Sequence, residues 1–211
     1  IESSEFNQYL LPLVFYKYLS DRVLTYVLEI MEKPTDTLQN AQKSFEILCK
    51  DEDTEKVILK KIQEKLGYTI KPEFTFMAHI QLIQKGSFEI EHLDGSLKAI
   101  QRGHEVFRDI FEETDLRSKK FGYSIHSNNK VFSEVLQSLY SIGNMTEYTQ
   151  KELGDFFEDL IGSIASDAGR KSEGFYTPKS ITKVLTQIAL EGKEVQPELT
   201  VYDPTMGSGS L

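Results

Sequence analysis

The sequence predicts a mainly α-helical protein whose last residues form the beginning of an α/β domain. Two observations support this fold class. Apolar residues recur at helical spacing through most of residues 1–166. Residues 199–202 instead form a short β-branched run, which an acidic residue and a Gly-Ser turn follow. Doubly wound α/β domains open their ligand cleft with a strand that ends in this way.

The first expected element is one long helix over residues 4–31, because apolar residues recur there every three to four positions. Phe15 and Tyr18 make its first half apolar nearly all round, so this half should be central to a helical bundle. Pro12 should either begin the regular helix or kink it. The residues 20–22, Ser-Asp-Arg, are expected to mark where one face of the helix turns polar.

Six further helices are expected before the chain changes character. Gly67 is a typical C-terminal stop for one of them, and Thr149 with Glu152 three residues later forms the sequence pattern of a capping box for another. Residues 115–129 are rich in Ser, Asn and Lys and are expected to be a loop with little regular structure. The expected helices cover residues 37–50, 54–66, 74–84, 93–102, 130–141 and 149–165.

The second part of the chain is expected to begin near residue 167. Residues 167–174 are polar and contain two glycines, which is typical of a linker. A helix over residues 178–190 and the strand over residues 199–202 should follow. The expected domains are therefore a helical domain, residues 1–166, and a linker with the start of an α/β domain, residues 167–211.

Composition excludes several classes of protein. The net charge of −9 argues against a domain whose main task is to bind phosphates, although a local patch or a partner subunit could still contact DNA. The one cysteine, Cys49, cannot form an internal disulfide, and no apolar run reaches the length that crosses a bilayer, which together suit a cytoplasmic protein. The four histidines lack metal-site spacing, so no metal is expected.

Two segments carry residues suited to binding. Phe175-Tyr176-Thr177-Pro178 could stack aromatic rings on a base, or could simply begin a helix with its rings in the core. The segment from Asp203 to Ser210 combines an acceptor with glycines that let a ligand approach the backbone, but a plain loop would look alike. A nucleotide P-loop is excluded because no Gly-Lys-Ser/Thr follows.

In this order, the two segments resemble the modification (methyltransferase) subunit of type I restriction-modification systems. That family reads roughly Gly-Glu-Phe-Tyr-Thr-Pro, then a helix, then Asp-Pro-x-x-Gly-Ser-Gly. Here Glu173 and Gly174 stand in the opposite order, and Met206 stands where Cys or Ala is common. The resemblance extends to residues 11–21, 67–73, 111–118 and 156–169.

The resemblance implies a helical N-terminal bundle followed by the first helix and strand of a Rossmann-like, S-adenosylmethionine-dependent adenine-N6 DNA methyltransferase domain. It implies a specificity subunit and a restriction subunit as partners, duplex DNA in the full complex, and no membrane. The family's catalytic Asn/Asp-Pro-Pro-Phe/Tyr motif is not in these residues, so the chain alone is expected to be truncated and inactive. The implied cofactor-binding residues are Gly174, Phe175, Tyr176, Thr177, Pro178, Asp203, Gly207, Ser208, Gly209 and Ser210.

Two alternatives remain open on the sequence. The chain could be a non-enzymatic helical module that docks a specificity subunit or clamps DNA, or it could be part of a stand-alone adenine methyltransferase that carries its own recognition domain.

Overall fold

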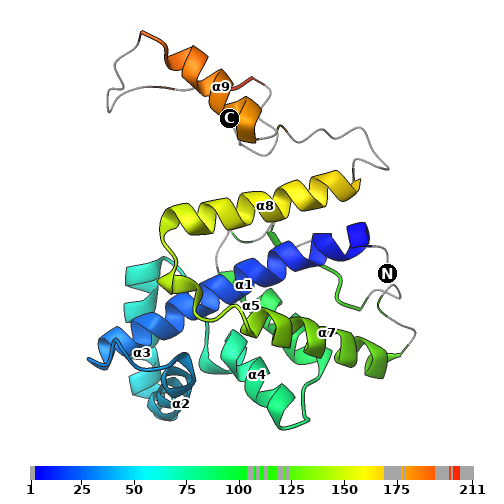
Figure 1. The fold of residues 1–211 in the computed structure, drawn as a ribbon. Coiled ribbons are helices and arrows are strands. Elements are labelled where there is room, and N and C mark those ends of the chain that lie inside the picture. Colours follow the sequence, from blue (N-terminus) through cyan, green and yellow to red (C-terminus); the bar gives the residue numbers. More distant parts are fainter. Residues whose placement is uncertain are drawn as a thin grey trace. The chain divides into compact units, whose positions relative to one another are not determined.

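The computed structural model describes most of the chain as helices joined by short loops (Figure 1). It divides into two compact units, residues 1–153 and residues 154–211. The domain boundary expected at residue 166 stays a prediction. The described residues are 3–103, 107, 110–111, 114–117, 121, 124–168, 177, 179–192, 200 and 202–204.

The described helices confirm the mainly helical fold class. The first unit ends within the first turns of α8, and the second unit holds the rest of α8 and α9. The elements are α1 (Ser3–Ile30), α2 (Leu38–Leu48), α3 (Glu52–Leu66), η1 (Pro72–Phe74), α4 (Phe76–Gln84), α5 (Ile90–Gly103), α7 (Ile125–Tyr140), η4 (Met145–Glu147), α8 (Gln150–Ala168) and α9 (Lys179–Leu190).

Helix α1 is the core of the first unit, as its apolar pattern predicts. It packs against α2, α3, α4 and η4 (Figure 1). Leu13 and Tyr16 are fully buried, and the rings of Phe15 and Tyr18 are half-buried. Pro12 lies inside α1 and does not begin it. A central helix with an apolar surface this wide can bury side chains against several neighbours at once.

Residues 20–22 are where one face of α1 turns polar, but the first two of them lie in the interior. Ser20 and Asp21 are both 0% exposed. The Ser20 hydroxyl oxygen accepts a hydrogen bond from the backbone N–H of Phe76 at 2.7 Å, at the start of α4. Partners from distant segments bond the Ser20 hydroxyl and the Asp21 Oδ2, whereas the Asp21 Oδ1 is buried without a hydrogen-bond partner.

Local capping signals set several helix ends as predicted. Gly67 ends α3 with a φ of 82°, in the left-handed region that glycine adopts easily. Thr149 and Glu152 form the expected capping box at α8: the Glu152 carboxylate accepts from the Thr149 N–H at 2.8 Å, and the Thr149 hydroxyl accepts from the Glu152 N–H at 3.2 Å. The acidic residues 51–53 are exposed at the start of α3. Their negative charges stabilise the helix by interacting with the positive end of its dipole.

Two expected irregular segments contain more structure than predicted. Helix α7 begins at Ile125, inside the expected loop over residues 115–129, because Ser124 caps it and pairs reciprocally with Ser127. In the same loop Phe121 is buried, with its ring 4.6 Å from that of Tyr9. Helix α8 continues to Ala168, so residues 167 and 168 of the expected linker are helical.

The expected strand over residues 199–202 is not observed. Thr200 and Tyr202 are described without strand structure, and residues 199 and 201 lie outside the described part of the chain. The described residues contain no strand, so the Rossmann-like part of the expected fold stays a prediction.

Candidate functional site

The structure describes two of the expected cofactor-binding residues, Thr177 and Asp203. Both are half-buried. Thr177 lies two residues before the start of α9, and Asp203 stands between Tyr202, which is 87% exposed, and Pro204, which lies in an exposed turn. The proximity of the two loops stays a prediction, because the other expected residues lie outside the described ones: Gly174, Phe175, Tyr176, Pro178, Gly207, Ser208, Gly209 and Ser210.

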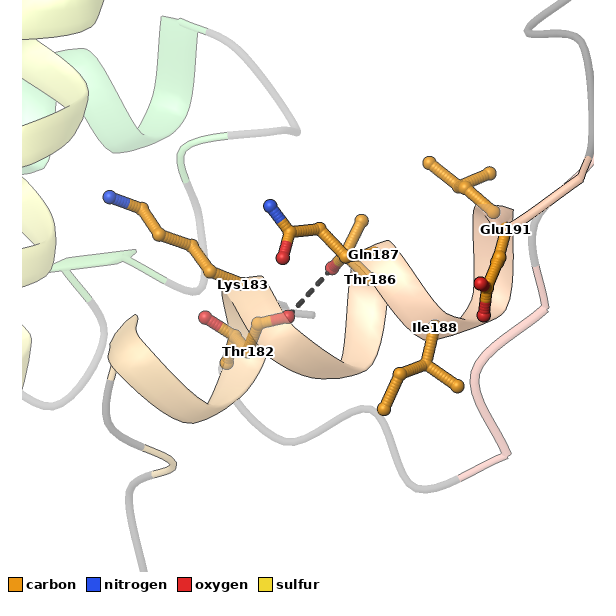
Figure 2. Close-up of a pocket in the computed structure, with 7 residues that line it drawn as sticks. Thr182, Lys183, Thr186, Gln187, Ile188 and Glu191 are labelled. Carbon is orange, nitrogen blue, oxygen red and sulfur yellow. Dashed lines mark hydrogen bonds between the residues drawn. The ribbon is translucent and has the colours of Figure 1, made fainter.

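In the sequence, helix α9 lies between the two expected binding loops. Its side chains line an open hollow with a volume of about 830 Å³. Figure 2 shows the labelled side chains spread around this one helix, with the Thr186 hydroxyl donating to the Thr182 carbonyl at 2.8 Å. Of the described residues that line this hollow, all but Glu191 belong to α9, and Glu191 directly follows the last residue of the helix. They do not assemble an acid, a base and a nucleophile.

The apolar side chains of α9 are unusually exposed. Ile181, Val184, Leu185 and Ile188 are each between 44% and 63% exposed, whereas Thr182 is buried. The sequence predicted the helix and its bounds within one residue, but it did not predict this exposure.

His79 is a buried residue of the helical core. Its ring is 0% exposed, and its Nε2 is hydrogen-bonded to the Ser96 hydroxyl at 2.9 Å. Burial lowers the pKa of His79 to about 3, so the ring is neutral at physiological pH. No group of three or more His, Cys, Asp or Glu in the described residues could hold a metal ion.

Cys49 does not have the properties of a nucleophile. Burial, with Glu55 and Glu73 nearby, raises the pKa of its thiol to about 11. A reactive cysteine needs the opposite shift, because the thiolate is the attacking species.

A buried ion pair in α1 is the feature that sequence reasoning missed. Lys17 is 2% exposed and Asp21 0% exposed, and the Lys17 Nζ lies 2.5 Å from the Asp21 Oδ2. Burial raises the pKa of the Asp21 carboxyl, and the neighbouring ammonium opposes that shift. The available signal was the spacing of four residues between opposite charges inside an otherwise apolar helix.

Both parts of the chain match models of known protein families. Residues 1–139 match the family model described as HsdM N-terminal domain, and residues 149–211 match the model described as N-6 DNA Methylase. The chain belongs to the HsdM N-terminal domain family. The match spans the described elements from α1 to α5 and all but the last residue of α7.

Known relatives agree with this assignment. The chain is 26% identical over 226 aligned residues to the type I restriction enzyme MpnII methylase subunit of Mycoplasma pneumoniae, covering 100% of this chain and 40% of that protein. The crystal structure of a type I restriction-modification system methyltransferase subunit from Streptococcus thermophilus superposes with a TM-score of 0.91 at 38% identity, covering 100% of this chain and 44% of that one. The chain thus spans less than half the length of these relatives.

The comparisons confirm the resemblance found in the sequence, which was to type I modification subunits. None of the described helices combines the length and the apolar character that spanning a membrane requires.

Proposed function

We propose that this chain works as part of the methylase subunit of a type I restriction-modification system, which transfers the methyl group of S-adenosylmethionine to N6 of adenine in duplex DNA. The observation that carries this proposal is the order of the two matched families, an HsdM N-terminal domain followed directly by the start of an N-6 DNA methylase domain. The two relatives that the chain matches carry the names of a type I methylase subunit and a type I methyltransferase subunit.

The residue types in the two expected loops suit S-adenosylmethionine. The half-buried Asp203 supplies a carboxylate that suits the ammonium group of the cofactor. The backbone N–H groups of residues 207–209 suit the carboxylate of the cofactor. Residues 175–178 supply two aromatic rings and an N-cap for the next helix. When bound, the cofactor supplies a methyl group that its sulfonium activates for transfer.

The acidic balance of the chain fits a division of labour within a complex. At a net charge of −9, the chain is a poor general phosphate binder, so we assign sequence choice to a separate specificity subunit. A restriction subunit completes the system, and the target adenine must be flipped out of the duplex before its N6 can react. This activity on DNA belongs in the cytoplasm.

A second candidate function applies to the helical unit. Residues 1–153 form a compact unit of their own that contains the whole HsdM match, and the methylase match begins at residue 149, near the end of this unit. The 211 residues contain no Asn/Asp-Pro-Pro-Phe/Tyr motif. Docking of the specificity subunit is the role that such a helical unit can perform without catalytic groups.

The test measures methyl transfer from labelled S-adenosylmethionine to duplex DNA by a methylase subunit that contains this chain, together with its specificity subunit. Asp203→Ala removes the acceptor and Gly207→Val places a branched side chain against the ligand, so both variants should lose transfer and still bind the specificity subunit. Asp53→Ala and Gly95→Val are the controls, because Asp53 is an exposed carboxylate and a Cβ on Gly95 would meet nothing within 4 Å.

The 211-residue chain alone should show no transfer above background. Normal cofactor affinity and activity in either loop variant would refute the assignment of the loop. Transfer absent from the intact subunit with its partner, while the partner still binds, would favour the docking role.

A further inference from the structure

We draw no further inference here: the strongest candidate, the exposed apolar face of α9 formed by Ile181, Val184, Leu185 and Ile188, carries nothing because the described part of the chain does not show what covers it.

Discussion

Replacing Leu13 by alanine tests whether α1 is the core of the helical unit. Leu13 is 0% exposed in the middle of the apolar first half of the helix. The substitution removes three carbon atoms, which at about 0.8 kcal/mol each costs about 2.4 kcal/mol of transfer free energy. The cavity left behind raises the loss to about 3–5 kcal/mol, because close-packed neighbours relax only in part.

The assay is thermal unfolding of the 211-residue chain, followed by circular dichroism. For a unit of this size, each kcal/mol lowers the unfolding midpoint by about 2–4 °C, so we expect a fall of about 6–20 °C. Phe15→Ala should cost less, because its ring is half-buried against Phe107 and Phe111 at centroid distances of 5.8 and 6.4 Å.

Ile47→Ala on α2 is the control, because Ile47 is 64% exposed and should change the free energy of unfolding by less than about 0.5 kcal/mol. An unchanged midpoint for Leu13→Ala would refute the reasoning and would place α1 on a surface.

Three smaller perturbations probe individual contacts. Ser20→Ala should lower the free energy of unfolding in urea by about 1–3 kcal/mol, because it leaves the buried Phe76 N–H without an acceptor; a loss below 0.5 kcal/mol would contradict this (about the noise of surface changes). Burial lowers the pKa of the His79 ring from 6.5 to about 3, so between these pH values the unfolded chain binds a proton that the folded protein does not. The free energy of unfolding should therefore fall by about 1.4 kcal/mol per pH unit as the pH drops from 6.5 toward 3. Urea titrations of His79→Gln should show a weaker dependence of this free energy on pH. Gly67→Ala should lower the free energy of unfolding by about 1–2 kcal/mol, because the φ of Gly67 is 82°. Gly95→Ala within α5 should raise it by about 0.5–1 kcal/mol. Equal thermal unfolding midpoints for the two variants would argue against both expectations.

Features set by local sequence could be predicted from the chain. The Thr149–Glu152 capping box and the Gly67 stop depend on residues within a few positions of each other, so their sequence pattern was sufficient. The start of α7 was also local, and Ser124 with Ser127 was the signal that the prediction of a loop overlooked. Helix α9 was predicted from its period, although the exposure of its apolar face depends on what packs against it.

The burial of polar residues in α1 could not be predicted, because each partner comes from a distant part of the chain. Ser20 bonds to Phe76, 56 residues later, and Asp21 to Met145, 124 residues later. Spacing alone gives Ser20 and Asp21 the signature of a solvated face. The expected cofactor loops rest on composition and order, and of their residues the structure describes Thr177 and Asp203.

The two kinds of residue in the segment over residues 11–21 have separate tasks, and the structure explains why their pattern is specific. The apolar residues Leu13 and Val14 fill the core, a task that several apolar side chains could perform, whereas the buried Tyr16 also donates its hydroxyl to the Phe74 carbonyl at 2.8 Å. The polar residues Lys17, Ser20 and Asp21 bond to backbone groups at the start of α4 and before α8. A helix that kept only the apolar pattern would still pack, but nothing in it would select where α4 and α8 begin. Because directional bonds to named backbone groups demand particular side chains at particular positions, this segment is a more specific mark of the helical domain than its hydrophobicity suggests.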